Sequence, residues 1–174
     1  MTRAAVTKLF AQRKQIVVQG KGEAIGQVVK RFNVPDAEKP VKEILKVDVN
    51  YDTTQVAVND LVKVSASVTF NPPEPMEAGM VVLDISVPTG FTPVTESIDA
   101  AMAKDKRLKR YDVAGRKVIF YIENMQPGDK VSLSFDVKAM YPVKAKAVAS
   151  IAYSYYKPDI KGETLSQDVT VIAK

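Results

Sequence analysis

The chain has 174 residues, of which 46% are hydrophobic and 26% charged, the composition of an ordinary globular domain with no apolar run near the roughly 20 residues of a membrane-spanning helix. The net charge is +5, but seven basic side chains and one acid lie in residues 1–31, so the remainder is close to neutral and lacks the clustered positive potential of a nucleic-acid-binding surface. Histidine and cysteine are absent, which excludes imidazole bases, catalytic triads, thiolate nucleophiles, disulfides and His or Cys metal ligands.

The first 40 residues are expected to contain a β-hairpin followed by a linker. Residues 15–18 and 25–29 are short β-rich runs, and Gly20 and Gly22 between them supply the conformational freedom of a hairpin turn. Residues 35–40 contain two prolines and three charged residues, a composition that favours an exposed linker over a paired strand.

Residues 47–171 predict an all-β fold, an antiparallel β-sandwich. Apolar and polar residues alternate with the period of half-buried strands at 47–51, 62–70, 131–137, 145–155 and 169–171. The denser apolar run at 80–87 predicts a central strand. In the segment 145–155 we expect one long strand with a single face made of Ala145, Ala147, Ala149, Ile151, Tyr153 and Tyr155.

One segment departs from the period of two. Ile98, Ala101 and Met102 share one helical face, which predicts a short amphipathic helix within about residues 95–106. Thr95 is the expected N-cap, and lysines follow at the other end.

The order of segments between residues 79 and 158 resembles one family. They are GMVVLDISVP (79–88), TGFTP (89–93), KRYDV (109–113), KVIFYI (117–122), VSLSF (131–135) and AYSYYKP (152–158). This succession is typical of the C-terminal receptor-binding domain of alpha-macroglobulins. That domain has a Met-Val strand ending in Asp, a Gly-Phe turn, a helix, an Arg-Tyr strand, an Ile-Tyr strand and a tyrosine-rich end. Residues 41–174 resemble that domain, and residues 1–34 are similar to the last strands of the CUB-type domain that precedes it.

The resemblance implies a non-catalytic recognition or docking module of a protease-trapping endopeptidase inhibitor, with other domains of the parent protein or a surface receptor as partner. The thioester and bait region that such proteins use cannot lie in this cysteine-free chain. The resemblance also implies an extracellular or periplasmic location. Residues 1–10 lack a secretory pattern, so we expect the chain to begin inside a larger protein.

The partner-binding residues are predicted at the basic end of the helix, and they are Lys104, Lys106, Arg107 and Lys109. The two receptor-binding lysines of animal family members align with Thr95 and Asp99, so that role is not carried over. No catalytic residue, cofactor or metal ligand is expected. The tyrosines at 141, 153, 155 and 156 are interpreted as core or rim residues. The alternative function is a structural or adhesive β-sandwich module of the cell envelope with no connection to proteases.

Overall fold

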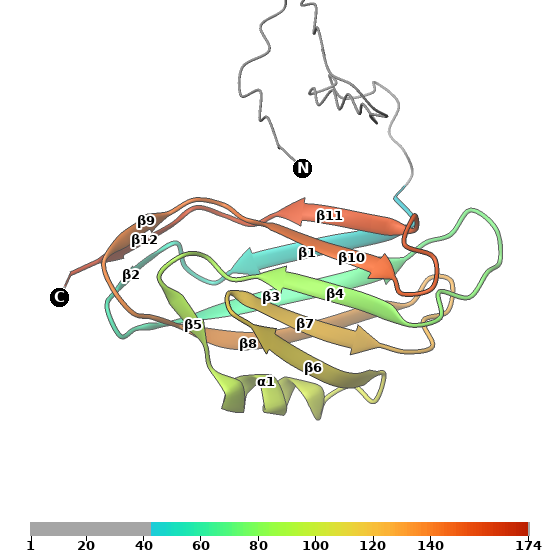
Figure 1. Ribbon diagram of the computed structural model, residues 1–174, viewed down its shortest axis with the longest axis horizontal. Coiled ribbons are helices and arrows are strands. Elements are labelled where there is room, and N and C mark those ends of the chain that lie inside the picture. Colours follow the sequence, from blue (N-terminus) through green and yellow to red (C-terminus); the bar gives the residue numbers. More distant parts are fainter. Residues whose placement is uncertain (1–42, 174) are drawn as a thin grey trace, which may run out of the picture. The chain divides into compact units, whose positions relative to one another are not determined.

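The computed structural model describes residues 43–173, so the predicted hairpin at 15–29 and the predicted linker at 35–40 lie outside the described residues. Within this part of the chain, two large sheets face each other and a smaller sheet lies at one end (Figure 1). The first sheet has the order β1 (Leu45–Tyr51), β3 (Leu61–Phe70), β8 (Lys130–Ala139) and β5 (Phe91–Pro93). The second has the order β11 (Lys161–Leu165), β10 (Ala149–Ser154), β4 (Val81–Ser86), β7 (Lys117–Ile122) and β6 (Leu108–Ala114). Both are antiparallel throughout.

The smaller sheet joins β2 (Gln55–Ala57), β12 (Val169–Ile172) and β9 (Val143–Ala145). Its β2–β12 pair is parallel, the one parallel pair among the described strands.

The core lies between the inward faces of the two large sheets. Alternate residues of β3 and β8, such as Val64 and Phe135, point inward and meet Leu83 of β4 and Phe120 of β7, all of them buried. The rings of Phe120 and Phe135 lie 5.9 Å apart, a separation typical of favourable aromatic contact. The prediction of an antiparallel β-sandwich is therefore confirmed, and β4 is the central strand of its sheet as expected.

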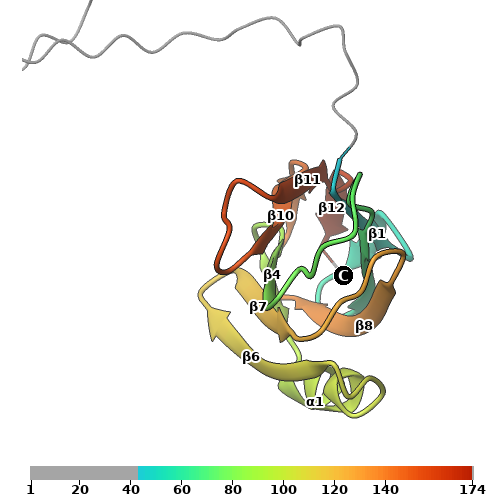
Figure 2. The same ribbon diagram turned by 90° about the vertical axis from the view of Figure 1, so that its right-hand side faces the viewer.

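At one edge the two sheets come together, and the backbones of β1 and β11 approach closely there (Figure 2). Gly162 of β11 permits this approach, because a Cβ atom on it would lie 1.7 Å from the carbonyl oxygen of Leu45. The absence of a side chain at this position lets the sandwich close on this side.

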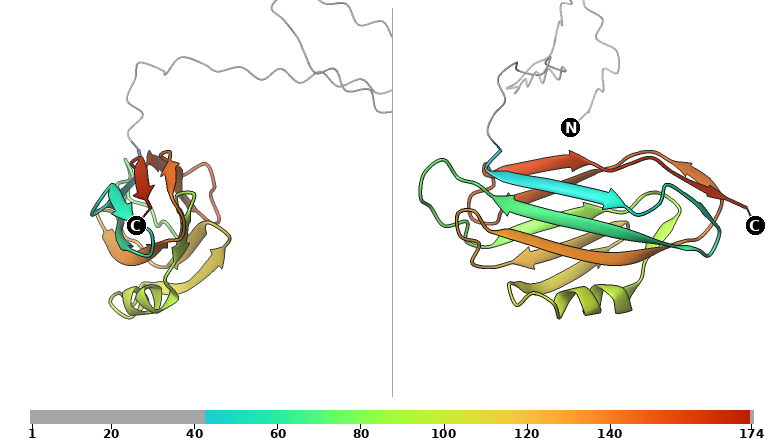
Figure 3. Two further views of the ribbon diagram at one scale, coloured as in Figure 1. Left: turned by 90° about the vertical axis from the view of Figure 1, so that its left-hand side faces the viewer. Right: turned by 180° about the vertical axis from the view of Figure 1, so that it is seen from behind.

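At the opposite edge, α1 (Thr95–Met102) packs against β8 and β6 (Figures 2 and 3). Ile98 and Ala101 are buried in the contact, and Tyr111 of β6 donates a hydrogen bond of 2.7 Å to the carboxylate of Asp99. The predicted helix and its apolar face are confirmed.

The expected Thr95 cap is wrong. Val94 is the N-cap residue and no side chain caps the helix. The Ser97 hydroxyl instead donates to the carbonyl oxygen of Val94 (2.7 Å) and accepts from the backbone N–H of Asp136 in β8 (2.8 Å). The start of the helix is thereby fixed to the neighbouring strand.

The single strand expected over residues 145–155 is also wrong, because the chain forms β9 and β10 in two different sheets. The break falls where the Asp168 carboxylate accepts hydrogen bonds from Lys146 Nζ (2.8 Å) and the backbone N–H of Ala147 (2.7 Å). In β10 the buried residues are Ser150, Ala152 and Ser154, opposite to the face predicted.

The two serines of β10 can face inward because their hydroxyls find partners. Ser154 donates to the carbonyl oxygen of Ala78 (3.0 Å), and Ser150 accepts from the backbone N–H of Ser86 (3.1 Å). Buried polar groups with hydrogen-bond partners are tolerated in cores. Ile151 and Tyr153 consequently point to the outside of the sheet.

Candidate functional site

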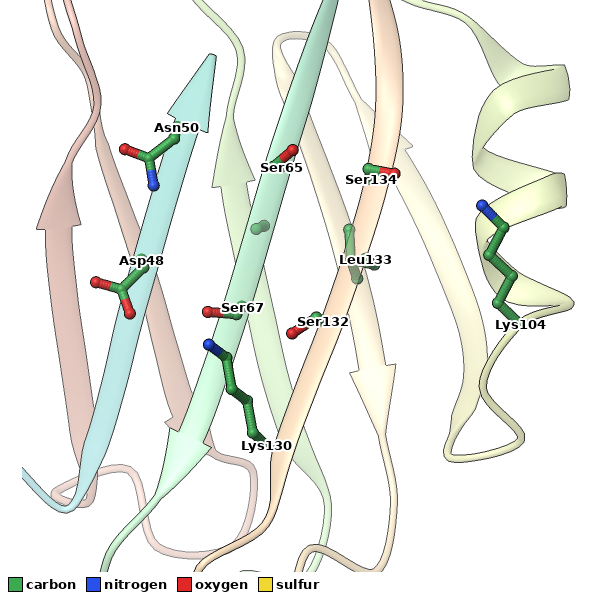
Figure 4. A pocket seen from close by; sticks show the side chains of 10 residues that line it. Asp48, Asn50, Ser65, Ser67, Lys104, Lys130, Ser132, Leu133 and Ser134 are labelled. Carbon is green, nitrogen blue, oxygen red and sulfur yellow. The ribbon is translucent and has the colours of Figure 1, made fainter. Parts of the chain in front are cut away.

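The four basic residues predicted to bind a partner do not form one surface. They follow α1 in a short turn and the start of β6. Lys104 lies beside the outer face of the first sheet (Figure 4), Lys106 is exposed, and Lys109 lies on the side of the second sheet, 3.8 Å from the carboxylate of Glu123.

Arg107 is held by its own acidic neighbours. Its guanidinium lies 2.7 Å from the carboxylate of Asp105 and 3.4 Å from that of Asp129, and it donates to the carbonyl oxygen of Lys130 at 3.2 Å. The hydrogen bond from Arg107 lowers the pKa of the Asp105 carboxyl, and the same contact raises the pKa of Arg107. This cluster ties the turn after α1 to the start of β8.

A different set of residues forms an exposed aromatic surface at the end of the second sheet where β7 and β10 finish and β4 and β6 begin, on the right in Figure 1. We call it the tyrosine surface, and it consists of Met80, Lys109, Arg110, Tyr121, Tyr155 and Tyr156. These side chains line a shallow depression of about 380 Å³.

Two rings of the tyrosine surface are open to solvent and packed against each other. Tyr155 and Tyr156 are 56% and 72% exposed, and their rings meet edge to face with centroids 5.2 Å apart. The Arg110 guanidinium lies 4.4 Å from the centroid of the Tyr121 ring and 2.9 Å from the carboxylate of Asp112. Exposed aromatic and arginine side chains in contact are the residue types enriched at the centres of protein interfaces.

The apolar character continues along the outer face of the second sheet. Val82 points outward yet is only 2% exposed, and the half-buried Tyr121 and Tyr153 lie beside it in the same row, whereas Ile119 and Ile151 are half-buried on either side of Asp84. In the adjacent row, Asp84 pairs with Lys117, and its second oxygen is buried with no hydrogen-bond partner among the described residues. A buried acceptor without a donor is uncommon in folded proteins.

This surface is suited to binding another protein. Among residues 43–173 there is no group of three or more acidic side chains placed to hold a metal ion, and none of the described helices has the length and apolarity to cross a membrane. The aromatic and cationic side chains offer contact area and hydrogen-bond donors.

The tyrosine surface was not predicted from the sequence, because the alternation of residues 145–155 places Tyr153 and Tyr155 on one face of a long strand. In the structure, Tyr155 lies beyond the end of β10, where the backbone N–H of Tyr155 bonds to the carbonyl oxygen of Met80 (2.8 Å). The pair of adjacent tyrosines followed by Lys157-Pro158 was the signal that could have found it, because a strand cannot bury two consecutive rings on one face.

Comparison with known proteins places the chain in a family. Residues 76–166 match the family model of the A-macroglobulin receptor binding domain. Complement C3 of Eptatretus burgeri is 28% identical over 87 residues, which are 49% of this chain and 5% of that protein.

Two solved structures share the fold. A crystal structure of the C-terminal part of native Escherichia coli alpha-2-macroglobulin has a TM-score of 0.61 at 12% identity, over 74% of this chain and 23% of that one. A cryo-EM structure of the native conformation of the same protein has a TM-score of 0.63 at 13% identity, over 78% of this chain and 10% of that one.

The chain thus spans only a small part of the length of these relatives. The match to the family model covers half of the chain. The chain belongs to the alpha-macroglobulin family and carries its receptor-binding domain.

Proposed function

We propose that this chain is a non-catalytic docking module of an alpha-macroglobulin-like, protease-trapping protein, and that it docks through the tyrosine surface. The observation that carries the proposal is the exposure of Tyr155 and Tyr156 beside the apolar outer face of β4, β7 and β10. A solvated sheet face is ordinarily polar, whereas an apolar face with aromatic anchors gains free energy when a partner covers it.

The partner we propose is another domain of the parent protein, in an extracellular or periplasmic setting. Because Arg110 and Lys109 already pair with Asp112 and Glu123, the tyrosine surface has little net charge. Its partner therefore needs to be complementary in shape and apolar area more than in charge.

The basic residues after α1 are proposed to steer association by their charge, although they do not lie on one surface. Lys104 and Lys106 have no acidic partner among the described residues, whereas Arg107 is neutralised by Asp105 and Asp129. Exposed rim charges change association rates more than affinity, so Lys104, Lys106 and Lys109 are the positions whose reversal should slow docking.

We propose the domain boundaries that the sequence predicts. Residues 1–34 would be the end of a CUB-like domain, 35–40 a linker and 41–174 the receptor-binding domain. Only the last of these contains described residues.

Hydrogen exchange tests the docking function directly. Backbone amides of residues 79–82 and 154–157 would be compared between this chain alone and the longest natural product of its gene. Docking predicts slower exchange at these amides in the longer product and unchanged exchange in β3, on the other sheet. Equal exchange at the tyrosine surface in both would contradict docking there.

A protease assay tests the absence of activity in the chain itself. Added at a tenfold molar excess to trypsin and a protein substrate, the chain should change the rate of substrate cleavage by less than the error of the assay. Stoichiometric inhibition by the chain alone would overturn the proposed division of roles between this module and its parent.

A further inference from the structure

The outer face of the first sheet carries a second, chemically different depression, which we call the serine groove (Figure 4). It has a volume of about 390 Å³ and is lined by Asp48, Asn50, Ser65, Ala66, Ser67, Lys104, Lys130, Ser132, Leu133 and Ser134. Strand register places its polar side chains in two rows across β1, β3 and β8, one of Asp48, Ser67 and Ser132 and the other of Asn50, Ser65 and Ser134. The turn after α1 brings Lys104 to the side of the groove next to β8.

The serine hydroxyls of this groove have no hydrogen-bond partner within residues 43–173, unlike Ser97, Ser150, Ser154 and Ser166 elsewhere in the fold. Ser67 is the most telling of them, because it is only 9% exposed and lines the groove at its centre. A hydroxyl that lines a depression and lacks an internal partner is available to a bound ligand.

Two ammonium groups border the groove. Lys130 extends toward Ser67, and Lys104 lies on the far side of β8 (Figure 4). Neither is within ion-pair distance of an acidic side chain in the described part of the chain. On the opposite side, the Asp48 carboxylate lies 3.9 Å from the ammonium group of Lys46. The groove is therefore cationic toward β8 and offers strong acceptors toward β1.

We propose that the serine groove binds an anionic oligosaccharide, whose carboxylate or sulfate groups pair with Lys104 and Lys130. The sugar hydroxyls would donate to Asp48 and exchange hydrogen bonds with Asn50 and the serines. This site lies on the sheet opposite to the tyrosine surface and does not depend on the docking function.

An acidic peptide is the competing ligand, and the lining of the groove disfavours it. Protein partners are anchored by large apolar or aromatic side chains, and the groove has none, since Ala66 and Leu133 lie beneath its polar rows. The hydroxyl groups of a sugar can donate to the Asp48 carboxylate, whereas the ionised side chains of an acidic peptide are acceptors only.

The test is a titration of the ¹⁵N-labelled chain followed by amide chemical shifts, with three probes at low salt. The probes are the tetramer of α-1,4-linked galacturonic acid, the neutral maltotetraose and hexaglutamate. The proposal predicts shifts confined to β1, β3, β8 and the turn after α1 with the galacturonate tetramer, and an affinity at least about tenfold above that for the other two probes.

Variants assign the contacts. Lys104→Gln and Lys130→Gln should each weaken binding by about fivefold to tenfold, and Ser67→Ala and Ser132→Ala each by about threefold to fivefold, as expected for charged and neutral hydrogen bonds. Lys161→Gln, on the outer face of the other sheet, is the matched control and should bind as the unaltered chain does. Dispersed spectra and unchanged melting temperatures would show that the variants fold.

Three results would each overturn the proposal. The first is the absence of shifts at the groove with the galacturonate tetramer. The second is hexaglutamate binding as tightly as the galacturonate tetramer, with no effect of the serine variants. The third is maltotetraose binding as tightly as the galacturonate tetramer. A Tyr155→Ala/Tyr156→Ala variant should keep the shifts, which separates this proposal from the docking function.

Discussion

At the scale of single residues, the fold depends on positions where a substitution would create a steric overlap or remove a polar contact. Gly162 is the clearest, because β1 and β11 could not approach as they do if it had a side chain. The Arg107–Asp105 contact is another, because it fixes the turn that links α1 to β6 and places Lys104 beside the serine groove.

Replacement of Gly162 by alanine should lower the free energy of unfolding by about 3 kcal/mol or more, since the new Cβ would overlap the Leu45 carbonyl oxygen at 1.7 Å and the strands must shift apart. Urea denaturation measures the change. Glu163→Ala, at the exposed neighbouring position of β11, is the control and should stay within about 0.5 kcal/mol of the unaltered chain. Equal stability of the two variants would show that the edge can open without cost.

The stability contributed by Asp105 should depend on pH. Because Arg107 lowers the pKa of its carboxyl in the folded state, the contribution is present above the ordinary aspartate range near 4 and is lost as pH falls through the lowered value. The difference in unfolding free energy between the unaltered chain and Asp105→Asn should therefore shrink between pH 5 and pH 2.5. The difference in unfolding free energy between the unaltered chain and Arg107→Gln should shrink over the same pH range. A difference that stays constant across this range would contradict the assignment.

At the scale of elements, the sequence predicted the long strands well and the short ones poorly. The runs at 47–51, 62–70 and 131–137 correspond to β1, β3 and β8, because each is long enough for alternation to be read. Strands β2, β5 and β9 have three residues each, too few for a period, and they exist only through pairing with distant segments.

The direction in which β10 faces was not predictable from its residues alone. Alternation places Ile151 and Tyr153 on one face of the strand but does not say which of its two faces is buried. The actual inner face contains Ser150 and Ser154, which are stabilised by hydrogen bonds to Ser86 and Ala78, residues far away in the sequence. For the same reason the serine groove could not be predicted, since it joins strands through their register.

The helix α1 is held on the sandwich by its apolar face, so Ile98→Ala should destabilise the chain by about 2–5 kcal/mol, because Ile98 is fully buried against the strands. Thermal unfolding followed by circular dichroism measures the effect. Glu96→Ala, on the exposed side of the same helix, should change the stability by less than about 1 kcal/mol. Similar effects of both variants would mean that α1 is not part of the core.

At the scale of the whole molecule, the two outer faces differ in chemistry. The first sheet presents rows of serine, asparagine and aspartate, and the second presents Val82, isoleucines and the tyrosine surface. The family resemblance was predictable from the order of the segments, but this asymmetry appears only once the strands are paired. It separates a face proposed for docking from a face proposed for an anionic oligosaccharide.

The boundary near residue 40 is testable by truncation. Removal of residues 1–38 should leave a cooperatively unfolding protein with little change in melting temperature, because residues 41–174 contain every predicted strand of the sandwich and enough chain for one domain. Differential scanning calorimetry of both forms provides the comparison. Failure of the truncated form to fold would place the N-terminal strands in the same core.

The central claim is that the tyrosine surface docks against another part of the parent protein, and photo-crosslinking from Tyr155 tests it most directly. The natural gene product would carry p-benzoylphenylalanine at position 155 or, as control, at position 63 on the outer face of the other sheet, and would be irradiated in its own cells. We expect position 155 to crosslink to one defined site in the parent, mapped by mass spectrometry, and position 63 to give no defined product. Crosslinking from position 155 that is no more frequent or specific than from position 63 would contradict the claim.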